Sequence, residues 1–127
     1  MSAFAAEDYR RPQFSAEFDI CMEKSGGVTV DARACANAEL KRQDQRLNKA
    51  YAQLGKAADD GVKAKMKDAQ RGWIQFRDAE CVLRGEIEEG TLRELVVDSC
   101  HLRFTEQRAN ELDQLGERLG RKLGGNG

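Results

Sequence analysis

The stretch "QRGWIQFRDAEC", residues 70–81, has the periodicity of an amphipathic helix. Trp73, Arg77 and Cys81 recur every four residues, so their side chains share one face of that helix. The same stripe runs over residues 62–84 and predicts one long helix. It also raises a chemical question, because a guanidinium in line with a tryptophan and a cysteine is costly to bury unless an acidic partner neutralises it.

Two further helices are expected, one on each side of this one. Upstream, Asp31 is the expected N-cap, and apolar residues recur at helical spacing over residues 40–58. Downstream, Thr91 with Glu94 three residues later is a capping-box signature, and the stripe that follows continues to Leu119. Three amphipathic helices with short connections predict an all-α fold, an up-down-up antiparallel three-helix bundle.

The two ends of the chain lack this periodicity. We expect residues 1–20 to form a flexible N-terminal arm, residues 21–119 the helical domain, and residues 120–127 a mobile glycine-rich tail. Ala3 and Ala5 make an A-x-A pattern typical of the end of a secretory signal. The arm is therefore interpreted as the remnant of a signal peptide that has been removed.

The composition restricts the classes of partner. Acidic residues number 22 and basic residues 21 in a chain of 127, giving a net charge of -1. The chain lacks the excess of positive charge that neutralises a phosphate backbone, so a nucleic-acid partner is not expected. No apolar run approaches the roughly 18 residues that a membrane span needs. Four cysteines, an even number, favour a periplasmic or secreted location.

The cysteines are expected to form two disulfides. Cys81 and Cys100 lie at nearly equal distances before and after Gly90, so a helical hairpin folded there brings them opposite each other. Cys21 would then pair with Cys35. Of the three possible pairings, geometry favours this one, although the sequence by itself does not settle the connectivity.

The residues around the cysteines do not favour a metal site or a catalytic role. The chain has no C-x-x-C motif, and its single histidine, His101, is adjacent to Cys100. On a helix, adjacent side chains diverge by about 100°, which disfavours both a zinc site and a Cys-His nucleophile. We expect no metal, no cofactor and no catalytic residue.

The charges inside the helix stripes are expected to pair with one another. Asp44 lies in the first stripe, Arg77 in the second and Arg108 in the third, so Asp44 should pair with Arg77 or Arg108. A network that fixes helix register is favoured over a polar cluster that faces a ligand. Its expected members are Asp44, Asn48, Arg77, Asp78, Thr105 and Arg108.

Three segments together resemble a known family: "CANAELKRQDQRLNKAYAQL", "QRGWIQFRDAEC" and "CHLRFTEQRANEL". They are similar to the LprI-like secreted bacterial domain, named for a lysozyme inhibitor, over about residues 21–115. Phe76 stands where a tyrosine is common in the family. The motif positions of the family fall here on Glu39, Leu40, Asp44, Leu47, Asn48, Tyr51, Gln70, Trp73, Phe76, Arg77, Asp78, Cys81, Cys100, Thr105, Arg108 and Leu112.

The resemblance implies a helical, disulfide-bonded domain exported to the periplasm or cell surface, with lysozyme inhibition as its activity. Since lysozymes work through two carboxylates in a cleft, an inhibitor would insert a loop that carries a basic or hydroxyl group. The candidate loops are residues 24–29 and 84–93. The candidate basic residues on them are Lys24, Arg84 and Arg93.

The sequence also allows two other classes of function, an adaptor and an enzyme. A non-catalytic adaptor for another envelope protein would need an exposed apolar patch, and the sequence has no clear surplus of apolar residues for one. An enzyme is the weakest hypothesis, because the chain lacks an activated nucleophile, a metal set and a cofactor motif. The sequence makes no prediction of the oligomeric state.

Overall fold

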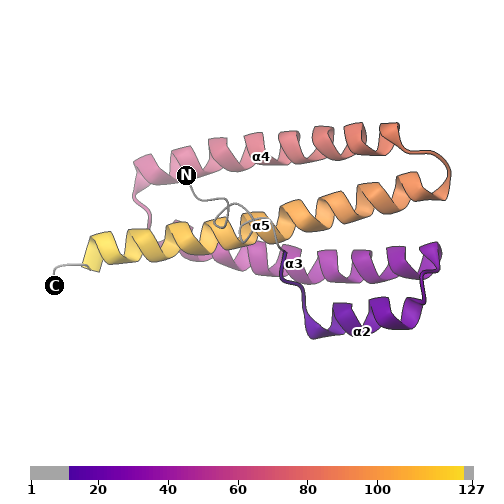
Figure 1. Cartoon of the computed structure of the whole chain (residues 1–127). Helices are drawn as coiled ribbons and strands as arrows, with labels where there is room; N and C mark the ends of the chain where they lie inside the picture. Colours follow the sequence, from indigo (N-terminus) through magenta and orange to yellow (C-terminus); the bar gives the residue numbers. More distant parts are fainter. Residues whose placement is uncertain (1–11, 125–127) are drawn as a thin grey trace, which may run out of the picture.

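The computed structural model describes residues 12–124, and within that range it contains four α-helices and no strand. They are α2 (Ala16–Ser25), α3 (Thr29–Ala57), α4 (Asp60–Ile87) and α5 (Thr91–Gly124) (Figure 1). The all-α class is confirmed. The expected number of three helices is wrong, because α2 forms in a segment that has no amphipathic period.

Helix α2 replaces part of the expected N-terminal arm. Its N-cap is Ser15, whose hydroxyl accepts a hydrogen bond from the Phe18 N–H at 3.2 Å. It ends at Gly26, which has the left-handed φ of 57°. Residues 16–20 are therefore helical, whereas residues 1–11, the rest of the expected arm, lie outside the described residues.

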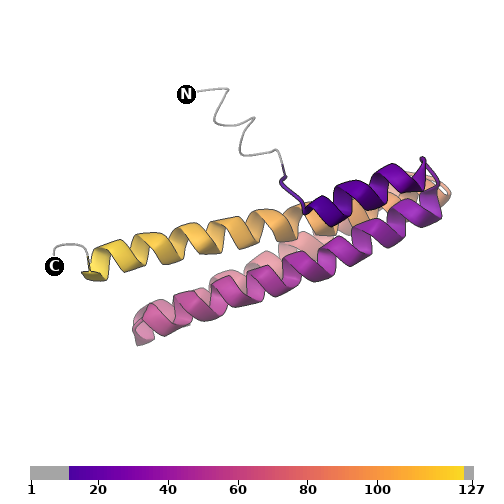
Figure 2. The same cartoon turned by 90° about the horizontal axis from the view of Figure 1, so that it is seen from below.

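The three long helices run in alternating directions, so α3 and α5 are parallel to each other and α4 is antiparallel to both (Figure 1). Helix α5 packs against both α3 and α4, and α2 folds back onto α3. Figure 2 shows α3 and α5 close together near their N-termini and diverging toward the C-terminus of α5. No helix in the described range is both long and apolar enough to cross a membrane.

The hydrophobic core lies in the half of the molecule where α3 ends and α4 begins. Tyr51, Trp73 and Leu119 are only partly buried and pack around it. Small side chains let the parallel helices α3 and α5 approach closely, while leucines and a methionine supply most of the apolar burial. The buried members of this core are Leu47, Ala50, Leu54, Ala58, Met66, Ala109 and Leu112.

Both expected disulfides are confirmed. Cys21–Cys35 joins α2 to α3 with a Cα–Cα distance of 5.7 Å, and Cys81–Cys100 joins α4 to α5 with a Cα–Cα distance of 5.5 Å. Each such bridge contributes on the order of 2–4 kcal/mol to stability.

The expected mobile tail is partly helical. Helix α5 continues to Gly124, so residues 120–124 extend the helix beyond the end predicted from the sequence. Residues 125–127 lie outside the described residues.

Candidate functional site

Two short connections lie at the same end of the molecule (Figures 1 and 2). One joins α2 to α3, and with the helical turns on either side of it we call it the glycine turn, residues 24–30. The other joins α4 to α5, and we call it the acidic turn, residues 88–90. Both candidate loops from the sequence are therefore located at this end.

The glycine turn has a backbone that only glycine adopts readily. Gly26 and Gly27 have φ values of 57° and 84°, and the Val28 N–H donates to the Ser25 carbonyl at 3.0 Å. Val28 and Val30 are exposed, at 53% and 72% of their full surface. The turn thus presents apolar side chains on a tightly folded backbone.

Covalent and ionic ties hold this turn on the rest of the molecule. Cys21–Cys35 connects the helices on its two sides. The Arg33 guanidinium, one helical turn beyond it, lies 2.8 Å from Glu94 and 2.8 Å from Asp98, both on α5. The hydrogen bond to Asp98 raises the pKa of Arg33 despite some desolvation. The start of α3 is therefore fixed against the start of α5.

The three candidate basic residues have different surroundings. Lys24 is exposed in the last turn of α2, within the glycine turn. Arg84 lies inside α4, where its Nε is 3.0 Å from a Glu80 carboxylate oxygen and its guanidinium lies over the Phe104 ring at 5.6 Å. Arg93 is in the first turn of α5, and its Nε donates to the Glu88 carbonyl at 3.3 Å. Arg84 and Arg93 are thus helical residues with partners, not tips of a loop.

The expected polar network is wrong in its central pair. Asp44 forms no ion pair with Arg77 or Arg108. Arg77 pairs instead with Asp78, another expected member of the network, at 2.9 Å, and its guanidinium lies over the Trp73 ring at 4.9 Å. This answers the question raised by the tryptophan-arginine-cysteine stripe, because Asp78 and the ring neutralise and cover the guanidinium.

The remaining expected network members, Arg108, Asn48 and Thr105, do not pair with Asp44 either. Arg108 donates to Gln70 at 3.0 Å and to Glu111 at 3.3 Å. Asn48 is exposed, and the buried Thr105 hydroxyl has no hydrogen-bond partner within the described range. Arg108 also lies over the Trp73 ring, at 5.9 Å, so the two arginines of the predicted network share this ring. Asp44, Asn48 and Thr105 do not join them.

A buried carboxylate that is a motif position of the family, but was not among the expected network members, connects α2 to α3. Glu39 is 0% exposed, and it accepts hydrogen bonds from the Ser15 N–H at 2.7 Å and the Ser15 hydroxyl at 2.6 Å. Burial by itself would raise the pKa of Glu39, but the bonds from Ser15, Arg42 and Gln43 outweigh it and lower the pKa to about 2. Glu39 therefore stays ionised and anchors the N-terminus of α2.

A second acidic side chain holds the segment before α2. The Gln13 N–H donates to the Glu106 carboxylate at 3.0 Å, and the Asn110 amide donates to the same oxygen at 2.9 Å. Glu106 is nearly fully buried. The chain from residue 12 onward therefore packs on α3 and α5 through two buried carboxylates. These hydrogen bonds join residues that are far apart in the sequence, so helical periodicity does not predict them.

No group of three or more histidine, cysteine, aspartate or glutamate side chains in residues 12–124 is arranged to hold a metal ion. The candidate site in the described range therefore consists of the exposed glycine turn and the disulfide and ion pairs that hold it.

Comparison with known proteins gives two matches. The sequence fits the family model described as "Lysozyme inhibitor LprI" over residues 21–112. It is also 33% identical over 102 residues to "Uncharacterized protein R02472" of Rhizobium meliloti (strain 1021), an alignment that covers 69% of this chain and 73% of that relative. No solved structure matches with significance.

Proposed function

The chain belongs to the lysozyme inhibitor LprI family, and we propose that it inhibits a lysozyme by inserting the glycine turn into the substrate cleft of the enzyme. The observation that carries this proposal is the combination at the turn of an exposed cation, Lys24, with two exposed valines on a backbone closed by a disulfide.

The chemistry of the cleft favours the glycine turn over the acidic turn. A lysozyme cleft holds two carboxylates, so the Lys24 ammonium would be attracted to it. The acidic turn carries Glu88 and Glu89, whose charges would repel those carboxylates. Arg84 and Arg93, the cations near the acidic turn, already have partners on their own helices or turn.

The rigidity of the glycine turn supports the same proposal. Binding costs less when a loop already has its bound conformation. Cys21–Cys35 and the Arg33 ion pairs limit the conformations that the turn samples before it meets an enzyme. We further propose that the protein works in the periplasm or outside the cell, where its two disulfides would persist.

The test is inhibition of a chicken-type lysozyme that hydrolyses cell walls, measured with titrated, oxidised protein. The unmodified protein should inhibit stoichiometrically. Lys24→Glu and Val30→Ser should each raise the inhibition constant by about tenfold or more, since they reverse or remove a central contact. The matched control is Val82→Ser, which changes the same side chain at 57% exposure on α4 and should inhibit normally.

A double variant, Cys21→Ser with Cys35→Ser, tests the rigidity without exposing the enzyme to a reductant. It should inhibit less well although its helices remain. Failure of the folded, oxidised protein to inhibit would overturn the proposal for this lysozyme class. Full inhibition by Lys24→Glu would show that the glycine turn is not the contact.

A second candidate function is an adaptor that binds another envelope protein. It is favoured by the exposed apolar side chains Phe76, Leu83 and Ile87, which follow one flank of α4. The sequence by itself showed no clear surplus of apolar residues for such a patch. Binding to a purified envelope protein that Leu83→Glu abolishes, with lysozyme inhibition absent, would support this function in place of the first.

A further inference from the structure

A cavity of about 680 Å³ opens at the end of the molecule opposite to the two turns. It lies between the C-terminal part of α3, the N-terminal part of α4 and the C-terminal part of α5, where α3 and α5 diverge (Figure 2). Its apolar lining includes Leu54, Met66, Leu112 and Leu119. This volume lies in the range of about 300–1,000 Å³ that is typical of small-molecule sites.

Part of the cavity lining, which we call the floor, belongs to the hydrophobic core, and another part of the lining is exposed to solvent. Leu54, Met66 and Leu112 are buried members of the hydrophobic core. Leu115 and Val62, which line the same space, are exposed. Apolar side chains that meet an open cavity leave apolar surface in contact with water, so a hydrocarbon ligand placed there would gain free energy from its burial.

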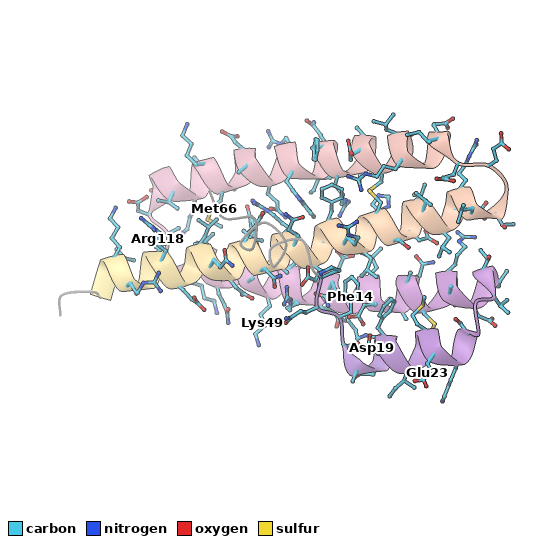
Figure 3. The ribbon with its side chains drawn as sticks, viewed as in Figure 1. Phe14, Asp19, Glu23, Lys49, Met66 and Arg118 are labelled. Carbon is cyan, nitrogen blue, oxygen red and sulfur yellow. A yellow bond between two sulfur atoms is a disulfide. The ribbon has the colours of Figure 1, made fainter. Side chains whose placement is uncertain are left out.

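The rim of the cavity is positively charged. Five cationic side chains line it and no acidic one does among the described residues, although the whole chain has a net charge of -1. Figure 3 shows Met66 and Arg118 together at this end of the molecule. The five cationic residues are Lys65, Arg108, Arg118, Arg121 and Lys122.

Most of these cations form no ion pair within residues 12–124. Arg108 is held by Gln70 and Glu111. Lys65, Arg118, Arg121 and Lys122 are exposed, and none of the four forms an ion pair with another residue in the described range. The rim therefore has free positive charge directly beside an apolar floor, which is the arrangement that an anionic amphiphile complements.

We propose that this cavity binds the acyl chain of a single-chain amphiphile whose anionic headgroup, a carboxylate or a phosphate, pairs with the cations of the rim. The apolar floor accounts for affinity, at about fourfold per buried methylene. The rim accounts for selection by charge. This site is separate from the glycine turn, so the proposal does not depend on lysozyme inhibition.

The probe is monomeric dodecanoate below its micelle concentration, titrated into the full oxidised chain by calorimetry. Dodecyltrimethylammonium, with the same chain length and the opposite charge, is the matched ligand control. We expect one dodecanoate to bind per chain, at least about tenfold more tightly than the cationic analogue. Absence of dodecanoate binding, or equal binding of the two, would overturn the proposal.

Two protein variants locate the site. Arg121→Glu with Lys122→Glu should weaken dodecanoate binding about tenfold and should not weaken the cationic analogue. Its control, Lys41→Glu with Lys49→Glu, makes the same change in net charge on α3 outside the cavity lining and should bind normally. Ala69→Phe, which fills the cavity from an exposed position on α4, should weaken both ligands. Equal losses in the two charge variants would mean that the whole-chain charge, not the rim, attracts the anion.

Vesicles of phosphatidylglycerol distinguish a bound amphiphile from a membrane surface. Sedimentation with vesicles in the absence of dodecanoate binding would assign the cations to a membrane contact and overturn the cavity proposal. Dodecanoate binding that Ala69→Phe removes would support a chain held inside the cavity, whether or not vesicles also bind. Circular dichroism of every variant checks that its helices are intact.

Discussion

The two ends of this molecule are held together in different ways. At the turn end, Cys81–Cys100 joins α4 to α5, Cys21–Cys35 joins α2 to α3, and Arg33 ties α3 to α5. At the other end, the described residues form no disulfide, and leucine, alanine and methionine side chains pack around an open cavity. Covalent and ionic ties thus help to stabilise the turn end, while apolar burial stabilises the end with the hydrophobic core.

The difference suits two kinds of binding. A turn that enters the cleft of another protein benefits from a fixed shape, since little conformational freedom remains to be lost. A cavity that accepts a flexible chain needs unfilled apolar space, which a fully packed core does not offer.

The largest effect is expected from removing the disulfide of the α4–α5 hairpin. Cys81→Ser with Cys100→Ser should lower the free energy of unfolding by about 2–4 kcal/mol, measured by urea denaturation. Hydrogen exchange should accelerate mainly in residues 81–100, while amides near Leu54 and Leu112 stay protected. Uniform acceleration along all four helices would contradict the division into two differently held ends.

A somewhat smaller, pH-dependent effect is expected at Glu39, the tie between α2 and α3. Its pKa is lowered from 4.5 to about 2 in the folded protein, so ionised Glu39 stabilises the fold above about pH 4.5. This stabilisation, about 3 kcal/mol, is lost as the pH falls from 4.5 toward 2.

The matching variant is Glu39→Gln. The difference in unfolding free energy between it and the unmodified protein should be constant between pH 5 and about 8 and should shrink below pH 4.5. Urea denaturation at several pH values measures this difference. A difference that did not change with pH would show that the packing of Glu39, and not its charge, stabilises α2.

The smallest effects on stability are expected from alanine substitutions at two glycines of α4. At Gly85 a Cβ would lie 2.5 Å from Val97 Cγ2, so Gly85→Ala should force α4 away from α5 and destabilise by about 1–3 kcal/mol. At Gly72 a Cβ would meet nothing within 4 Å, so Gly72→Ala should stabilise by about 0.5–1 kcal/mol through helix propensity.

Thermal unfolding of the two variants gives the sign of each effect. Gly85 lies one helical turn after Cys81 and close to α5, whereas Gly72 lies in the exposed middle of α4. If both variants were stabilised, the close approach of α4 to α5 at Gly85 would not be a real constraint.

The sequence predicted the three long helices and the disulfide pairing well, because both follow from local periodicity and from the symmetric spacing of cysteines about Gly90. It did not predict α2, which lacks an amphipathic stripe and depends on the cap by Ser15 and the distant acceptor Glu39. Contacts of this kind join positions far apart in the sequence, and the spacing of residues does not predict them.

The polar pairing was mispredicted for a geometric reason. Placing Asp44 opposite Arg77 assumes that all three stripes face one central axis. In the structure α4 packs mainly on α5, so Arg77 lies at the edge of that contact, beside Trp73 and Asp78. The cavity was unpredictable for a similar reason, since Leu112, Leu115 and Leu119 form an ordinary core stripe in the sequence and only helix divergence leaves space beside them.

The order of the cysteines has a consequence for how an exported chain would be oxidised. Cys21 bonds to the next cysteine in the chain, 14 residues later, and Cys81 bonds to the next one after it, 19 residues later. In a polypeptide that emerges from a membrane N-terminus first, each thiol would meet its native partner before any competitor arrives. Sequential oxidation therefore yields the native connectivity directly, without an isomerase to exchange mispaired bonds.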